Sequence, residues 1–274
     1  MRPLSSPPGW IAVGTKLTEH LTRCEALLKR RANYSAREEA ELALHYLCHV
    51  LDGLNNGYTS QPAVQDAMTA LFEAEDFENK NRVRNRESLS ALVLSHKTPI
   101  LKNADRAQLA PMTAAQHYRA FAQIKLVEAA QDHPWCSEIL YSLGRCYQAE
   151  AESDTKKQQS LLRRATVMYR AALEIAPKNT LAANQLGYIL LLMDQPQVAK
   201  PILVQSINAA PSLPAVQNLA EAAHRLNDQD TLAWANGYLQ QNNTGPQSAV
   251  PPVLEVEPTT FMAISPYGSG PQSR

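Results

Sequence analysis

Residues 180–213 read TLAANQLGYILLLMDQPQVAKPILVQSINAAPSL, and this stretch decides the fold that the chain is expected to adopt. Alanine and leucine, which favour helices strongly, make up most of its apolar positions. Gly187 lies in the first half, Ala199 lies in the second half, and Pro211 follows the last apolar run. Because proline cannot continue a helix, the stretch predicts two helices, the second of which ends before Pro211.

The same arrangement recurs along the chain. Proline stands at positions 134, 177 and 211, each time after an alanine-rich segment. The last two prolines are 34 residues apart, whereas the first two are 43 apart, which is one period with nine extra residues around 152–159. We expect this insert to join the two helices of its unit and to lengthen one or both of them. Equivalent positions before each proline carry small, large and small side chains, namely Ala122, Ala165 and Ala199, then Leu126, Tyr169 and Leu203, then Ala129, Ala172 and Ser206.

This layout resembles the tetratricopeptide repeat (TPR), whose unit has 34 residues, with Leu-Gly on its first helix and a terminal proline after its second. Gly144 and Gly187 stand at the glycine position, whereas the unit that starts at Pro214 has Glu221 there. The resemblance covers roughly 113–241 and implies a right-handed α-solenoid of antiparallel helix pairs. In such a pair, the glycine lets the second helix approach, and the alanine twelve positions before the proline is expected to face it.

The remainder of the sequence is also predominantly helical in its spacing, so the fold class predicted is all-α. Proline, glycine and serine are concentrated near the C-terminus, a composition typical of disordered tails. The expected organisation is a flexible N-terminal arm over 1–13, an N-terminal helical region over 14–98, a linker over 99–112, the TPR-like domain over 113–241 and a disordered tail over 242–274.

Composition and charge exclude several classes of protein. Lys plus Arg equals Asp plus Glu at 26 each, so the net charge is zero, which argues against nucleic-acid binding through a basic face. No apolar run approaches the roughly 20 residues that span a bilayer, and the N-terminus does not resemble a signal peptide. We therefore expect no membrane insertion and a cytoplasmic location.

The four cysteines do not indicate a disulfide framework. Cys136 and Cys146 are ten residues apart on one expected helix, about 15 Å along its axis, which is too far for pairing. Cys24 and Cys48 fall on consecutive expected helices, where they could approach each other. We interpret all four as small buried apolar side chains.

Few residues indicate chemistry. His45 and His49 share a helix face, as in helical zinc sites, with Cys48 beside them, but the sequence names no third ligand. The stretch 73–86 changes from acidic to basic, and we expect a solvated helix end whose charges neutralise one another. The sequence has no glycine-rich phosphate loop and no nucleophile elbow. We therefore assign no catalytic residue and no cofactor.

The TPR resemblance implies a concave groove that holds a peptide or a partner helix. Relatives that bind chaperone C-termini carry Lys and Asn where this chain has Tyr141 and Arg145, so that ligand is not expected here. The leading hypothesis is a non-catalytic scaffold or adaptor for a protein or peptide. The sequence does not determine its oligomeric state. The alternatives are a metal-dependent enzyme or sensor at His45 and His49, and a helical-repeat RNA-binding protein. The predicted groove residues are Glu138, Tyr141, Arg145, Gln148, Asn184, Tyr188, Leu191, Asn218 and Arg225.

Overall fold

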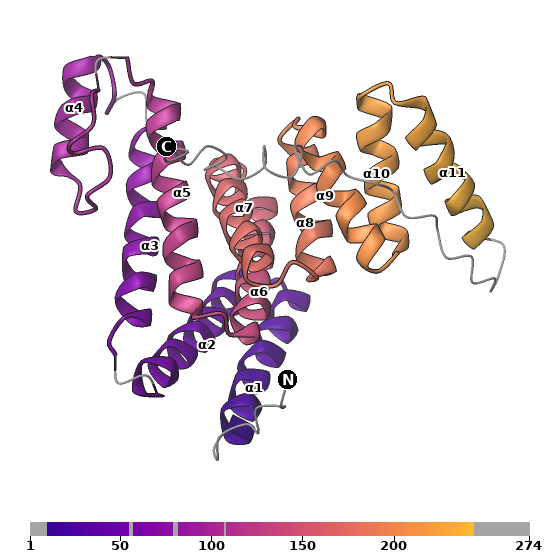
Figure 1. Ribbon diagram of the computed structural model, residues 1–274, viewed down its shortest axis with the longest axis horizontal. Coiled ribbons are helices and arrows are strands. Elements are labelled where there is room, and N and C mark those ends of the chain that lie inside the picture. The colour runs from indigo at the N-terminus through magenta and orange to yellow at the C-terminus, as the bar shows by residue number, and fades with distance from the viewer. Residues whose placement is uncertain (1–9, 55–56, 79–81, 107, 244–274) are drawn as a thin grey trace, which may run out of the picture. The chain divides into compact units, whose positions relative to one another are not determined.

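The computed structural model describes residues 10–54, 57–78, 82–106 and 108–243. In this part of the chain, the regular secondary structure consists of eleven α-helices and no strand (Figure 1), which confirms the all-α prediction. The same residues contain no helix with the length and apolarity that crossing a membrane requires. Residues 1–9 of the predicted arm and residues 244–274 of the predicted disordered tail lie outside the described residues.

The chain forms two compact units, Met1–Ile175 and Ala176–Arg274. Their boundary falls inside the range 113–241 that was expected to be one repeat domain. The first unit contains α1 (Trp10–Lys29), α2 (Asn33–Leu54), α3 (Ser60–Asp76), α4 (Arg86–Ser95), α5 (Pro111–Ala130), α6 (Pro134–Ser153) and α7 (Gln158–Ile175). The second contains α8 (Thr180–Leu192), α9 (Pro196–Ala209), α10 (Leu213–Arg225) and α11 (Gln229–Asn243).

Helices α1 and α2 pack together, and both contact α6. Helix α1 already begins at Trp10. Residues 10–13, which were expected to belong to a flexible arm, are therefore helical. The Trp10 ring stacks on His133, with the ring centroids 4.5 Å apart, and this contact holds the first turn of α1 in place.

Helices α3 and α5 pack along each other although α4 and its flanking turns separate them in sequence. Ala67 and Ala70 of α3 and Ala115 and Ala122 of α5 are all fully buried, and small side chains allow two helices to approach closely. The expected linker over 99–112 lies between α4 and α5, and its last two residues already belong to α5. Pairing of α5 with α3 could not be anticipated from the repeat pattern, because that pattern does not extend to α3.

The nine-residue insert lengthens both helices of its pair, as expected. Helices α6 and α7 have 20 and 18 residues, compared with 13 and 14 for α8 and α9. The added turns contact the N-terminal helices: Arg37 of α2 donates from Nε to Glu150 Oε1 of α6 over 2.6 Å, and Asn33 Nδ2 donates to the Ala149 carbonyl over 2.9 Å. The lengthened end of α6 therefore forms part of the surface on which α2 packs.

The two signature glycines lie where paired helices come closest. A Cβ atom on Gly144 would be 2.5 Å from Cε1 of Tyr169, and one on Gly187 would be 2.5 Å from Leu203. These distances are shorter than atoms can approach, so only glycine fits without movement of the neighbours. The expected close approach is present, but the facing residue is the large one, Tyr169 or Leu203, and not the alanine.

In the second unit, α8 packs on α9 and α10, and α10 packs on α9 and α11. Side-chain caps begin two of these helices: Asn179 accepts a hydrogen bond from Ala182 N, and Ser212 accepts one from Ala215 N. Helices α9 and α10 have a proline in their first turn. Backbone N–H groups in a first turn have no partner within the helix, and proline suits this position because it lacks the N–H. Local sequence therefore accounts for where these helices begin.

Candidate functional site

The four groove residues predicted on α6 differ in exposure. Glu138 is exposed, whereas Tyr141, Arg145 and Gln148 are half-buried. The Tyr169 hydroxyl of α7 donates a hydrogen bond of 3.2 Å to Gln148 Oε1, and the rings of Tyr141 and Tyr169 have their centroids 6.0 Å apart. These contacts join much of the predicted α6 face to α7.

Helix α1 lies against α6 at the same place. Arg145 forms an ion pair with Glu25 of α1, and its guanidinium carbon is 5.9 Å from the centroid of the Tyr141 ring. Burial favours a lower pKa for Arg145, but the hydrogen bond to Glu25 and the charge interactions with Glu25 and the neighbouring tyrosines together outweigh it, and the pKa is raised. The arginine that was predicted to bind a partner is therefore already paired within the chain.

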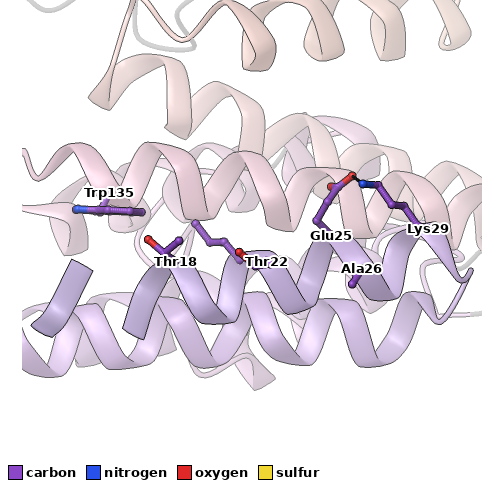
Figure 2. A pocket seen from close by; sticks show the side chains of 7 residues that line it. Thr18, Thr22, Glu25, Ala26, Lys29 and Trp135 are labelled. Carbon is purple, nitrogen blue, oxygen red and sulfur yellow. Dashed lines mark ion pairs between the residues drawn. The ribbon is translucent and has the colours of Figure 1, made fainter. Parts of the chain in front are cut away.

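A surface hollow of about 440 Å³ opens beside this contact (Figure 2). Trp135 lies at one end, and the ion pair between Glu25 and Lys29, with 3.8 Å between Oε1 and Nζ, lies at the other. Ligand pockets usually combine apolar walls with several converging polar groups, but here the two charged side chains face each other. The residues that line the hollow are Thr18, Leu21, Thr22, Glu25, Ala26, Lys29 and Trp135.

In the second unit, predicted groove residues on α8 and α10 bond to each other. Asn218 Nδ2 donates to Asn184 Oδ1 over 2.9 Å, and Arg225 donates from Nη1 to the Leu191 carbonyl over 2.7 Å. Both pairs are 34 residues apart. Residues 34 positions apart in the sequence therefore lie side by side in α8 and α10.

Exposure separates these residues into two groups. Leu191 is only 3 % exposed and Asn184 only 9 %. Both were predicted to line the groove, but neither presents a wide surface to a partner. Tyr188 and Asn218 are half-buried and retain accessible atoms. Arg225 is bonded to Glu221 Oε1 as well as to the Leu191 carbonyl, so it fastens the end of α8 to α10.

The alternative hypothesis placed a metal site at His45 and His49, with Cys48 beside them, but the structure gives the cysteine different surroundings from the histidines. His45 and His49 are exposed on α2, whereas Cys48 is fully buried. Burial raises the pKa of the Cys48 thiol to about 12, which disfavours the thiolate form that binds metals. Among the described residues, no group of three or more His, Cys, Asp or Glu side chains is arranged to hold a metal ion.

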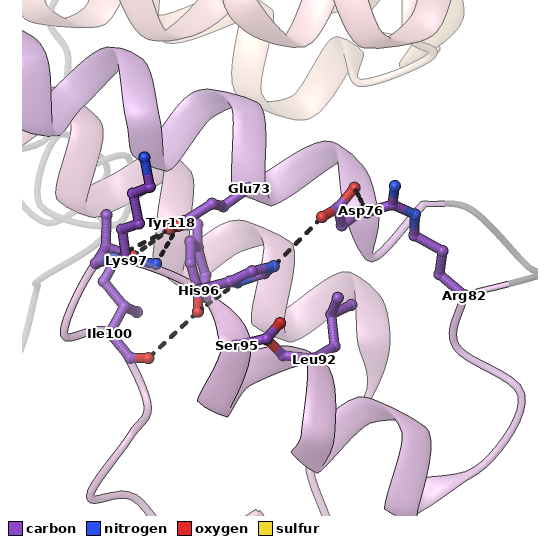
Figure 3. Close-up of polar contacts among 10 residues, drawn as sticks. Glu73, Asp76, Arg82, Leu92, Ser95, His96, Lys97, Ile100 and Tyr118 are labelled. Carbon is purple, nitrogen blue, oxygen red and sulfur yellow. Dashed lines mark hydrogen bonds and ion pairs between the residues drawn. The ribbon is translucent and has the colours of Figure 1, made fainter.

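A buried polar network, which the sequence analysis missed, connects α3, α5 and the turn after α4 (Figure 3). His96 Nδ1 is hydrogen-bonded to the Tyr118 hydroxyl at 2.8 Å, and His96 Nε2 lies 3.4 Å from Asp76 Oδ2. Glu73 accepts hydrogen bonds from Lys97 N–H and the Thr98 hydroxyl. Burial and the charge of Glu73 raise the pKa of Tyr118 to about 12.

This network resembles an acid–base relay in composition only. Tyr118 is 0 % exposed and His96 is 6 % exposed, so a substrate could not reach them in this conformation. The network instead attaches the turn after α4 to the α3–α5 pair.

The acidic stretch at the end of α3 was expected to be solvated, but its side chains contact other helices. Glu75 accepts a hydrogen bond of 2.6 Å from Arg164 Nε of α7, and Glu78 pairs with Arg119 of α5 and with Arg163 of α7. Asp76 pairs with Arg82 of the same stretch at 2.6 Å, as expected, whereas Glu75 and Glu78 are neutralised by arginines that are distant in sequence. The stretch is therefore part of the contact between α3, α5 and α7.

Comparison of the chain with protein-family models, with curated proteins and with solved structures gave no match. The function of the chain is therefore inferred from the geometry and chemistry of its own residues.

Proposed function

We propose that this chain is a non-catalytic interaction scaffold of the TPR type, built as a right-handed α-solenoid. Its binding face is formed by the first helices of successive repeats. On this view α8 and α10 are two such helices, and Tyr188 and Asn218 contact the partner.

The observation that carries the proposal is the hydrogen bond between Asn184 and Asn218, at equivalent positions of adjacent helices. A second bond with the same 34-residue separation joins Arg225 to Leu191. The close approach at Gly187 agrees with a TPR helix pair. Together these features support a repeat whose side chains recur in register along one face.

The chemistry of this face favours an extended peptide over a folded surface. Each asparagine amide has two donor hydrogens and two acceptor lone pairs, and the bond between Asn184 and Asn218 uses one of each. An extended peptide offers unpaired backbone N–H and C=O groups, whereas a helix has already paired most of its own. Tyr188 lies four positions after Asn184 on α8 and therefore on the same helix face, where its ring offers apolar contact and a hydroxyl group.

Selection from a displayed peptide library on the purified full chain tests the proposal. Enriched peptides are then titrated against wild type, the double variant Tyr188→Ala/Asn218→Ala and the control Gln197→Ala, an exposed position on α9. We expect the double variant to weaken binding at least tenfold, which corresponds to about 1.4 kcal/mol, and the control to change it less than twofold.

Thermal melting of the same variants separates binding from folding. Tyr188→Ala alone should melt within a few degrees of wild type, because its side chain is partly exposed. The double variant should lose about 1–3 kcal/mol of stability, because Asn218→Ala removes the hydrogen-bond donor of the nearly buried Asn184. Binding is therefore titrated well below the melting temperature of the double variant. Failure to enrich any peptide, or peptides that bind the double variant as well as wild type, would contradict the proposal.

A further inference from the structure

Two cysteines from distant parts of the sequence meet between α1 and α6. The Sγ atoms of Cys24 and Cys146 lie 3.5 Å apart, although 122 positions separate the residues. Both side chains are buried. The sequence analysis considered an approach of Cys24 to Cys48, but the partner in the structure is Cys146.

The charged residues next to the two cysteines also meet at this contact between α1 and α6. Glu25 follows Cys24, Arg145 precedes Cys146, and the two form an ion pair. The hydrogen bond from Cys146 lowers the pKa of Cys24 despite burial, and the charge of Arg145 adds to this effect. The same hydrogen bond, together with burial, raises the pKa of Cys146. Cys24 is therefore the thiol that ionises more readily, and Cys146 then donates the hydrogen bond to its thiolate.

The other two cysteines differ from this pair. Burial raises the pKa of Cys48 to about 12, and burial also raises the pKa of Cys136. A thiol that stays protonated reacts slowly with oxidants, because the thiolate is the nucleophile. Cys48 and Cys136 thus serve as internal controls.

We propose that Cys24 and Cys146 are a redox-active pair that closes into a disulfide between α1 and α6 when the chain meets a peroxide. The proposal rests on the placement of the two sulfur atoms and is independent of the proposed peptide binding.

The chemistry balances in two steps with hydrogen peroxide as the oxidant. The Cys24 thiolate attacks one peroxide oxygen, the O–O bond breaks, and hydroxide leaves and takes up a proton, which gives a sulfenic acid and water. The Cys146 sulfur then attacks the Cys24 sulfur, the S–O bond breaks, and the thiol proton leaves with the hydroxyl group as a second water. Two thiols lose two electrons, and one peroxide gains them.

The geometry needs little rearrangement for the second step. The sulfur atoms must approach from 3.5 Å to about 2.05 Å, the length of a disulfide bond, which side-chain rotation can supply in part. Peroxide reaches the buried pair when α1 moves briefly away from α6, because local opening of a helix contact needs less free energy than global unfolding. Oxidation is therefore expected to be slower than that of an exposed thiol.

Peptide mapping after oxidation tests the proposal directly. Reduced full-length protein is treated with hydrogen peroxide, denatured and alkylated, and the tryptic peptides are analysed by mass spectrometry without reduction. Cleavage follows Arg23 and Arg145, so each cysteine begins its own peptide, at 24–29 and 146–156. We expect these two peptides to be joined, and the peptides with Cys48 and Cys136 to be alkylated.

The controls distinguish this disulfide from other oxidation products. Dithiothreitol should restore all four alkylation sites, which it would not do for sulfinic acids. Cys24→Ala and Cys146→Ala should each abolish the joined peptide, whereas the matched variant Cys48→Ala should retain it. Four alkylated cysteines after peroxide treatment, or a disulfide between other residues, would overturn the proposal. Because the wild-type map is decisive by itself, a variant that fails to fold leaves the test intact.

Discussion

At Gly144 a missing side chain sets the distance between α6 and α7. A methyl group there would meet the Tyr169 ring, which is fully buried and has little room to move. Gly53 of α2 is different, because a Cβ atom there would have no neighbour within 4 Å. Alanine at these two glycines therefore separates the effect of packing on the free energy of unfolding from the effect of helix propensity, within the same unit of the chain.

We expect Gly144→Ala to destabilise the protein and Gly53→Ala to be neutral or stabilising. Overpacking at Gly144 costs about 1–3 kcal/mol, which exceeds the gain of up to about 1 kcal/mol when alanine replaces glycine in a helix. At Gly53 only the gain applies. Urea unfolding of both variants measures the difference, and a Gly144→Ala variant at least as stable as wild type would show that the close approach at α6 is not needed.

At the scale of helices, α3 receives its N-terminal cap from another helix. Asp52 of α2 is 7 % exposed and accepts hydrogen bonds from the backbone N–H groups of Thr59, Ser60 and Gln61, at 2.9, 2.7 and 3.0 Å. Burial favours a higher pKa for Asp52, but the three hydrogen bonds outweigh it, and the pKa lies below its ordinary value of 3.8. One carboxylate therefore joins α2 to the start of α3.

The pH dependence of Asp52→Asn tests this cap. A depressed pKa in the folded state means that the stabilisation is complete above pH 3.8 and is lost as the pH falls through the folded value. We expect Asp52→Asn to lower the unfolding free energy by about 1–2 kcal/mol at neutral pH, because an N–H group replaces one acceptor oxygen. Below about pH 3.8 the difference from wild type should shrink.

Asp66→Asn is the matched control for this prediction, since Asp66 is exposed on α3. It should alter stability by less than about 0.5 kcal/mol at either pH. Urea unfolding at neutral and acidic pH gives both values. A constant difference between wild type and Asp52→Asn across the pH range would show that the carboxylate charge does not act through this cap.

At the scale of the whole molecule, contacts between distant segments assemble the first unit. Arg145 with Glu25, and Cys146 with Cys24, join α6 to α1, while Arg37 joins α2 to the lengthened end of α6. Removal of α1 from α6 would break the first two contacts together. The N-terminal helices are therefore part of the same compact unit as the α6–α7 pair.

Closure of the proposed disulfide should stabilise this unit. A cross-link between residues 122 positions apart restricts the unfolded chain, and for loops of this size the chain-entropy model predicts about 4–5 kcal/mol before any strain is subtracted. We expect the oxidised protein to melt several degrees above the reduced protein, and Cys24→Ala to melt alike with and without peroxide. A disulfide that forms but leaves the melting temperature unchanged or lower would contradict the stabilisation.

The sequence by itself determined the helical class, the α6–α7 and α8–α9 pairs, the need for Gly144 and Gly187, and the effect of the nine-residue insert. These features depend on periodicity, on proline and on glycine, whose physical effects act within a few residues or within one hairpin. Only the tertiary structure decided that α3 pairs with α5, that Asp52 caps α3, and that Glu25 and Cys24 of α1 meet Arg145 and Cys146. Side chains so far apart in sequence meet because helices dock on their apolar faces, and docking alone selects which charges and thiols become neighbours.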